Sequence, residues 1–147
     1  MRIVTCNGCF DGIHPGHLFF LGFCRAQGDI LRVGINSDGY IRRNKREPFY
    51  SQHKRQKALM SLGFIHDVFV FDEPTPESFL VKMRPDVHCT GEENGLDCPE
   101  SKVCKELDIK LILVPRINYW STSDLEKEER ELVDFYMQRL LDKERSC

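Results

Sequence analysis

Short apolar runs alternate with amphipathic segments along most of the chain. The runs have the length and the β-branched content of buried strands, and we expect strands at 2–6, 30–35, 68–71, 87–90 and 111–114. Between them, apolar residues recur at helical spacing. This regular alternation predicts an α/β protein in which a mostly parallel sheet is covered by helices on both faces.

The predicted helices are set by the same pattern and by signals at their ends. They are expected at 18–24, 51–62 and 101–107, after Thr75, and from 123 to the end. Gly28 is expected to end the first helix in a left-handed conformation. Thr75 is expected to cap the helix that follows it, with Pro76 as the first helical residue.

Length and composition favour a single soluble domain over residues 1–147. Hydrophobic residues make up 41% of the chain, charged residues 30%, and the net charge is −2 with both signs mixed. This balance argues against a nucleic-acid or membrane surface. We see no signal peptide and no membrane-spanning run, so the seven cysteines are expected to be reduced in the cytoplasm.

One stretch, "NGCFDGIHPGH", concentrates the side chains that could do chemistry. Cys6 and Cys9 precede His14 and His17, which makes a zinc-binding structural domain one interpretation. Only four residues separate the two pairs, against about 12 to 15 in a zinc finger. We therefore expect no structural metal.

A phosphate site explains more of the same stretch. Pro15 suits the first turn of a helix, so His14 would stand at its entrance and His17 one turn later on the same side. The helix N-terminus adds unpaired N–H groups and the positive end of its dipole. Two imidazoles there could donate hydrogen bonds to a phosphate whose charge grows in a transition state.

The motif "GCFDGIHPGH" resembles the HxGH signature of the nucleotidyltransferase superfamily, in its cytidylyltransferase branch. The segments "INSDGYIRRNK", "HKRQKALMSLGFIHDVFVFDEPTPESFL" and "RPDVHCTGEEN" resemble the heptose 1-phosphate adenylyltransferase group in order and spacing. Glycerol-3-phosphate cytidylyltransferases are similar but more distant. The resemblance spans roughly residues 2–125 and implies a Rossmann-like three-layer sandwich with a long C-terminal helix.

The resemblance implies an enzyme that joins a nucleoside triphosphate to a phosphorylated acceptor and releases pyrophosphate, with Mg²⁺ as the metal. It favours an adenylyltransferase acting on a sugar 1-phosphate, and a homodimer. The alternative within the class is a cytidylyltransferase acting on glycerol 3-phosphate or an amino-alcohol phosphate. A nucleotide-binding module without turnover is the alternative from another class.

The resemblance also implies roles for individual residues. The catalytic set is His14, His17, Lys45 and Arg55. The nucleotide contacts are Gly8, Cys9, Phe10, Gly16, Gly91, Glu92, Arg116, Ser121, Thr122 and Ser123. Asp11 either contacts substrate or Mg²⁺ or fixes its loop. The set expected to be peripheral is Arg42, Arg43 and Arg46.

The chain departs from the family pattern near its nucleotide contacts. Tyr119 stands where a glycine is common, and Trp120 where a small aliphatic residue is common. Glu92 follows Gly91 where the family usually has an aspartate. These three departures leave the choice of base, ATP or CTP, open.

Overall fold

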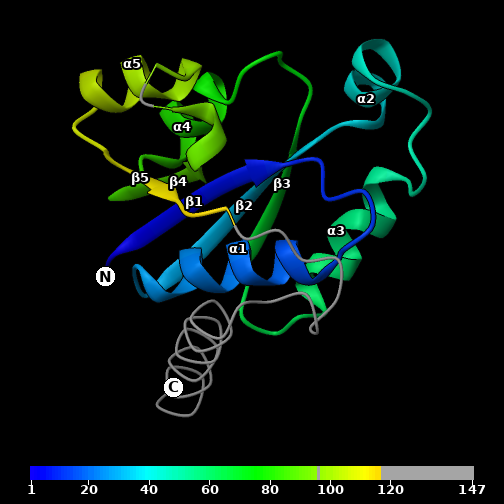
Figure 1. Ribbon diagram of the computed structural model, residues 1–147, viewed down its shortest axis with the longest axis horizontal. Helices are drawn as coiled ribbons and strands as arrows, with labels where there is room; N and C mark the ends of the chain where they lie inside the picture. The colour runs from blue at the N-terminus through cyan, green and yellow to red at the C-terminus, as the bar shows by residue number, and fades with distance from the viewer. Residues whose placement is uncertain (96, 117–147) are drawn as a thin grey trace.

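The computed structural model describes residues 1–95 and 97–116 (Figure 1). Its strands are β1 (Ile3–Gly8), β2 (Ile30–Asn36), β3 (Asp67–Phe71), β4 (Val87–Gly91) and β5 (Lys110–Val114). They form one sheet in the order β3-β2-β1-β4-β5, and every neighbouring pair is parallel. All the predicted strands are confirmed, each within two residues of its expected ends.

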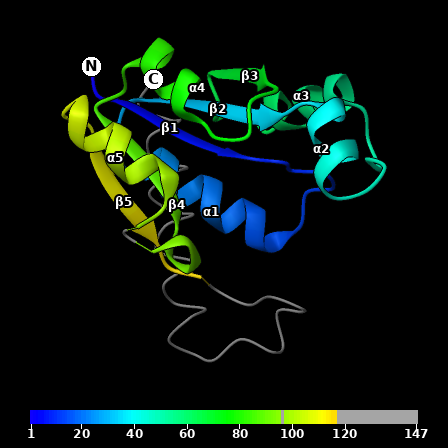
Figure 2. The ribbon, with the colours of Figure 1, turned by 90° about the horizontal axis from the view of Figure 1, so that it is seen from above.

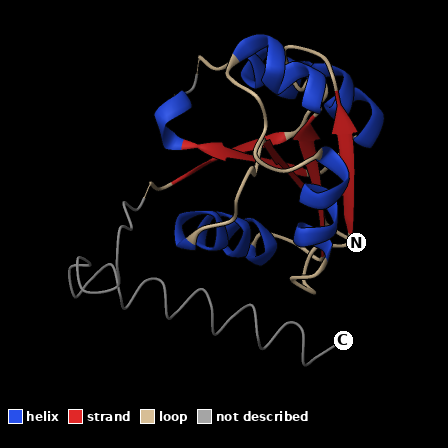
Figure 3. Ribbon diagram, turned by 90° about the vertical axis from the view of Figure 1, so that its right-hand side faces the viewer, coloured by secondary structure: helices blue, strands red, loops and turns tan. Residues whose placement is uncertain are grey.

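Helices cover both faces of this sheet. They are α1 (Pro15–Ala26), α2 (Asp38–Asn44), α3 (Gln52–Met60), α4 (Glu77–Met83) and α5 (Pro99–Glu106), with a short 3₁₀ turn, η1 (Glu92–Asn94). Apolar residues of α1 and α3 pack with the strands in one core, while α4 and α5 share a smaller one. Figure 2 shows α1 on one face and α4 and α5 on the other, and Figure 3 shows helices on both sides of the strands. The Rossmann-like α/β fold is therefore confirmed.

Gly28 does not have the predicted left-handed conformation. The backbone of Gln27 caps α1 in the right-handed region, and Gly28 is not among the residues with positive φ. A Cβ atom on Gly28 would lie 2.6 Å from Val4 Cγ2 and 2.8 Å from the Arg2 carbonyl oxygen. The glycine is needed because the turn packs directly against β1.

Two local predictions around the sheet edge were also wrong. Helix α4 begins at Glu77 with Pro76 as its N-cap, and no side chain caps it, so Thr75 does not cap the helix. Helix α2 was missed because its segment "DGYIRRN" carries little apolar periodicity. Ser37 starts that helix, and its hydroxyl accepts a hydrogen bond from the Tyr40 N–H at 3.0 Å.

The strand order defines where a ligand can bind. Because all the strands are parallel, their carboxyl ends meet at one edge of the sheet. Strands β2 and β3 are added on one side of β1, and β4 and β5 on the other, so the order of strand addition reverses between β1 and β4. Ligands of such sheets bind in the crevice at that reversal. The predicted helix from residue 123 lies outside the described residues. Within residues 1–95 and 97–116, no helix is long and apolar enough to cross a membrane.

Candidate active site

His14 and His17 cap the start of α1 by a reciprocal exchange of hydrogen bonds. Nδ1 of His14 accepts from the backbone N–H groups of Gly16 at 3.1 Å and His17 at 3.4 Å. Nδ1 of His17 accepts from the backbone N–H of His14 at 3.3 Å. This is the capping-box arrangement with two imidazoles. Because each Nδ1 is an acceptor, the neutral rings carry their protons on Nε2.

The two rings stack on the same side of the helix start. Their centroids are 3.7 Å apart and their planes 22° from parallel. Gly16 makes this possible, since a Cβ atom there would lie 2.9 Å from Cε1 of His14. The side chains of His14 and His17 thus project on the same side of the helix start, as expected. Gly16 is glycine because a larger residue would crowd the His14 ring.

His17 is neutral at physiological pH. Burial lowers its pKa, the neighbouring His14 lowers it further, and a hydrogen bond with the Gly12 backbone partly opposes both, giving a value of about 4. Phe10 contributes to the burial, with its ring 5.2 Å from the His17 ring in an edge-on arrangement. His17 can therefore act near pH 7 as a neutral N–H donor.

Phe10 also explains the glycine at the end of β1. Its backbone is left-handed, with φ of 49°, and its side chain is only 5% exposed. A Cβ atom on Gly8 would lie 3.0 Å from the Phe10 ring. The expected nucleotide contacts Gly8 and Phe10 thus lie together beneath His17.

Lys45 reaches the loop after β1 from the end of α2. Its Nζ lies 3.3 Å from Sγ of Cys9, and the Cys9 thiol donates to Oδ1 of Asn36 at 3.3 Å. An ammonium group and the imidazole-bearing loop therefore share the carboxyl edge of β1 and β2. The structure thus brings together Lys45 and Cys9, two of the expected site residues.

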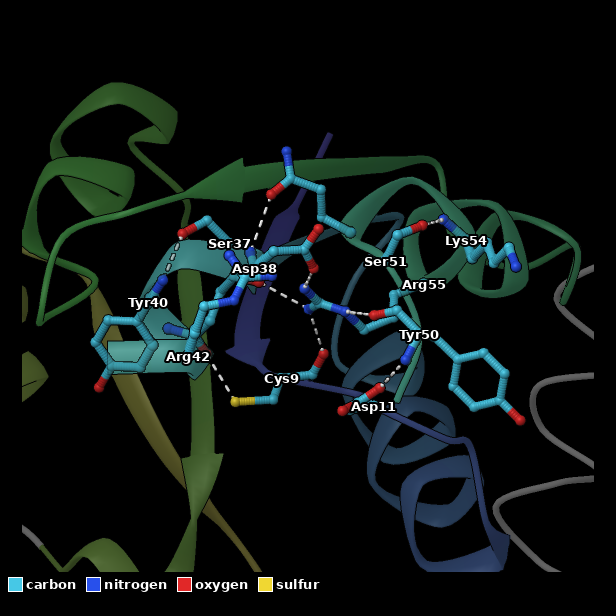
Figure 4. Close-up of polar contacts among 12 residues, drawn as sticks. Cys9, Asp11, Ser37, Asp38, Tyr40, Arg42, Tyr50, Ser51, Lys54 and Arg55 are labelled. Atoms are coloured by element: carbon cyan, nitrogen blue, oxygen red, sulfur yellow. Dashed lines mark hydrogen bonds and ion pairs between the residues drawn. The ribbon is translucent and has the colours of Figure 1, made fainter. Parts of the chain in front are cut away.

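Arg55 is buried, with 1% of its side chain exposed, and joins three segments of the site (Figure 4). Its guanidinium donates to the carbonyl oxygens of Tyr50 at 3.0 Å, Cys9 at 2.9 Å and Asn36 at 2.7 Å, and to the Asp38 carboxylate at 2.9 Å. Four of its five N–H donors are thus used within the protein. This geometry supports a positioning role for Arg55, which was expected in the catalytic set.

Asp11 fixes the loop before α1 to the loop between α2 and α3. Its carboxylate accepts from Arg46 Nη1 at 2.6 Å and from the backbone N–H groups of Phe49 and Tyr50, both at 2.8 Å. Burial alone would raise the pKa of Asp11, but these hydrogen bonds hold it below its usual value. Of the two expected roles, the geometry supports fixing the loop.

Arg46 is the residue that sequence reasoning missed here. It was expected to be peripheral, yet its guanidinium pairs with Asp11 and lies 4.2 Å from the centroid of the Phe49 ring. The two residues are 35 positions apart in sequence. A cluster of basic residues gave no signal that one of them pairs with the loop after β1.

The remaining expected contacts lie at the ends of β4 and β5. Oε1 of Glu92 accepts from the backbone N–H of Arg116 at 2.9 Å. A Cβ atom on Gly91 would meet the far end of the flexible Glu93 side chain, which can turn away. The other expected contacts and the two aromatic departures lie outside the described residues: Ser121, Thr122, Ser123, Tyr119 and Trp120.

Comparison with known proteins agrees with the fold and the motif. The sequence profile of the cytidylyltransferase-like family matches residues 5–142. The chain belongs to the cytidylyltransferase-like family. The family resemblance seen in "GCFDGIHPGH" is confirmed.

Among curated relatives, the chain is 41% identical over 109 residues to the bifunctional protein HldE of Campylobacter concisus, covering 72% of this chain and 23% of that one. It is 38% identical over 126 residues to the bifunctional protein HldE of Streptomyces coelicolor, covering 84% and 27%. The chain thus spans about a quarter of the length of these relatives.

Two solved structures share the fold. One is the lipopolysaccharide core biosynthesis protein of Thermoplasma volcanium, with a TM-score of 0.67, 23% identity, and 81% of this chain and 98% of that one covered. The other is the pantoate-beta-alanine ligase of Francisella tularensis, with a TM-score of 0.60, 13% identity, and 99% and 77% covered. At these identities the likeness extends to the fold alone.

The family assignment agrees with the side chains around the cysteines. Cys6 is fully buried in the strand core, and the Cys9 thiol is engaged by Asn36 and Lys45. In the described ranges, no group of three or more histidine, cysteine or acidic side chains is arranged to hold a metal. The surroundings of Cys6 and Cys9 are thus the apolar core for the first and two polar side chains for the second.

Proposed function

We propose that the protein is an adenylyltransferase that joins ATP to a sugar 1-phosphate and releases pyrophosphate, with residues 1–147 forming one nucleotidyltransferase domain. The observation that supports the chemistry is the stacked pair His14 and His17, whose Nδ1 atoms are both occupied by the helix start. The similarity to HldE proteins and to the heptose 1-phosphate adenylyltransferase group supports the choice of substrates.

In the proposed reaction, a phosphate oxygen of the acceptor attacks the α-phosphorus of ATP. A new P–O bond forms, the bond from the α-phosphorus to the bridging oxygen breaks, and pyrophosphate leaves with the bonding electrons. The Nε2–H groups of His14 and His17 donate to the phosphate oxygens on which charge increases. The N–H groups and dipole at the start of α1 stabilise the same charge.

Lys45 supplies the positive charge on the acceptor side of the reaction. Its Nζ is held 3.3 Å from Cys9 Sγ, beside the loop that carries the two histidines. Arg55 and Asp11 do not meet substrate in this proposal. They hold the loops of Lys45 and His14 in register, and catalysis is then positioning together with charge stabilisation.

A divalent metal accompanies the triphosphate in this family, and we propose Mg²⁺. The Asp11 carboxylate already accepts three hydrogen bonds, and its side chain is only 2% exposed. The described residues thus fit a magnesium ion whose ligands are mainly triphosphate oxygens and water. When bound, the ion neutralises charge on the phosphates.

Pyrophosphate release with each of the four nucleoside triphosphates, each paired with a panel of phosphorylated acceptors, tests the proposal. We expect turnover with ATP and an aldose 1-phosphate. Turnover restricted to CTP with glycerol 3-phosphate or phosphoethanolamine would establish the alternative enzyme. Nucleotide binding without turnover in any pairing would contradict the enzymatic function altogether.

A further inference from the structure

A cavity of about 470 Å³ opens beyond the carboxyl ends of β2 and β3. It is lined by Tyr40, Arg43 and Asn44 of α2 and by Asp72, Glu73 and Pro74 after β3. We propose that this cavity binds the hydroxyl-bearing sugar of the acceptor, an inference that rests on the proposed function. Its volume is within the range of about 300–1,000 Å³ that small-ligand pockets occupy.

The position of the cavity suits an acceptor and not the nucleotide. The sheet order places β2 and β3 on one side of β1, while Gly91 and Glu92 at the end of β4 lie on the other. Asn44 lines the cavity, and the next residue, Lys45, contacts the loop after β1. A sugar in the cavity would therefore have its phosphate beside Lys45, at the loop that leads to the imidazole pair.

The charges of the lining favour hydroxyl groups over phosphate. The cavity presents one guanidinium, from Arg43, and two carboxylates, from Asp72 and Glu73. Its net charge is therefore negative, which disfavours a phosphate, whereas carboxylate oxygens accept hydrogen bonds from hydroxyls. The two parts of the acceptor would thus bind in different places, the neutral sugar in the negatively charged cavity and the phosphate beside Lys45.

Asp72 is oriented by two side-chain hydrogen bonds. Its Oδ1 accepts from Ser37 Oγ at 2.5 Å and from Arg43 Nη2 at 3.1 Å, which leaves Oδ2 for a ligand. The Ser37 hydroxyl and then Arg43 hold the pKa of this carboxyl below its usual value, so it is an ionised acceptor at pH 7. The Arg43 pairing also makes Asp72 less attractive to a cationic ligand than a free carboxylate.

The neighbouring groups add further oriented acceptors. Glu73 Oε2 accepts from the Asp72 backbone N–H at 3.1 Å, which fixes the second carboxylate. Asn44 Nδ2 donates to the Tyr40 carbonyl at 2.9 Å, so its Oδ1 remains as an acceptor. Tyr40 adds an aromatic ring and a hydroxyl to the same wall. These acceptors match the several hydroxyl groups of a sugar ring.

The test compares Asp72→Asn with Glu77→Gln, a matched loss of one exposed carboxylate on α4 outside the cavity lining. We expect Asp72→Asn to raise the KM for the aldose 1-phosphate about tenfold, the scale of one hydrogen bond to a charged group, and to leave the KM for ATP unchanged. Glu77→Gln should match the parent in both. Equal KM values for the acceptor in parent and Asp72→Asn would overturn the inference.

Binding measured by calorimetry without nucleotide separates this inference from the proposed function. The probes are glucose 1-phosphate and mannose 1-phosphate, inorganic phosphate and phosphoethanolamine. We expect the parent to bind an aldose 1-phosphate more tightly than inorganic phosphate, and Asp72→Asn to lose that difference. Tighter binding of phosphoethanolamine, or no preference over inorganic phosphate, would overturn the sugar site whether or not turnover is seen. Absence of turnover alone would count against the proposed function.

Discussion

Two histidines in different parts of the molecule, His17 at the start of α1 and His88 in the middle of β4, both have a pKa lowered to about 4. Burial is the first cause at both, and at His17 the neighbouring His14 adds to it. His17 is half-buried at the sheet edge, whereas His88 is fully buried. Nδ1 of His88 lies 2.7 Å from Thr5 Oγ1, and its Nε2 has no hydrogen-bond partner among the described residues.

The same change in pKa therefore serves different ends. At His17 it keeps the ring neutral while its Nδ1 is used by the helix cap, so Nε2–H is the ring's donor in the proposed reaction. At His88 it is the cost of placing an imidazole in the core, with no route to a ligand. A low histidine pKa alone thus does not identify a catalytic residue, and the hydrogen-bond geometry around each ring makes the distinction.

The largest expected effect is on turnover. We expect His17→Ala to reduce kcat by about a hundredfold or more, the scale for removing one preorganised hydrogen-bond donor in a transition state. The free energy of unfolding should change little by comparison, because His17 is only half-buried. Pyrophosphate release at saturating substrates measures the first quantity, and urea unfolding measures the second.

His88→Gln is the matched variant for this comparison, since it alters a histidine of the same pKa in the core. It should keep kcat within about threefold of the parent, because the hydrogen bond of the His88 ring within the described residues is to Thr5 and not to the imidazole pair. A His17→Ala enzyme with near-parental kcat, or a His88→Gln enzyme as slow as His17→Ala, would end the distinction between the two histidines.

The second effect is on the pH dependence of stability. His88 has a pKa of about 4 in the folded protein and about 6.5 in an unfolded chain. Between these values the unfolded state takes up a proton that the folded state does not, so stability falls as the pH drops from about 6.5 to 4. Above about pH 6.5 His88 is neutral in both states and does not change the free energy of unfolding with pH. Below about pH 4 the loss of unfolding free energy from this site reaches up to about 3 kcal/mol.

Urea unfolding at several pH values between 7 and 4 measures this loss. Glutamine at position 88 can hydrogen-bond Thr5 but does not titrate, so His88→Gln should show a shallower fall over the same range. Carboxylates such as Asp11, whose pKa is held low, contribute equally to both proteins. Parallel curves for parent and variant would show that folding does not lower the pKa of His88.

The sequence was sufficient for the strands and for the imidazole pair because both depend on local pattern. The spacing of His14, Pro15 and His17 fixes a helix start, and the apolar runs fix the sheet. Arg46 and Arg55 were misjudged because their partners are distant in sequence: Arg46 pairs with Asp11, and Arg55 with Cys9 and Asn36. Such pairings depend on which loops the parallel sheet brings together.

Helix α2 shows the same limit at short range. Its residues are mostly polar, and the signal that starts it is the Ser37 hydroxyl, which also donates to Asp72 after β3. The hydrogen bond from Ser37 after β2 to Asp72 after β3 joins residues far apart in sequence, so the residues next to Ser37 give no sign of it. The cavity beside α2 was missed for the same reason, since its two walls come from segments about thirty residues apart.

The smallest effect separates the two tasks of His14, capping α1 and donating to phosphate. His14→Ala removes the acceptor used by the N–H groups of Gly16 and His17, which should cost about 1 kcal/mol of stability. Serine is a good N-cap, so His14→Ser should recover most of that loss in urea unfolding. Neither variant has an Nε2–H, so both should be slow in pyrophosphate release to the same degree. If serine restored turnover along with stability, His14 would act only by capping the helix. If His14→Ala were as stable as the parent in urea unfolding, the imidazole cap would have no energetic role.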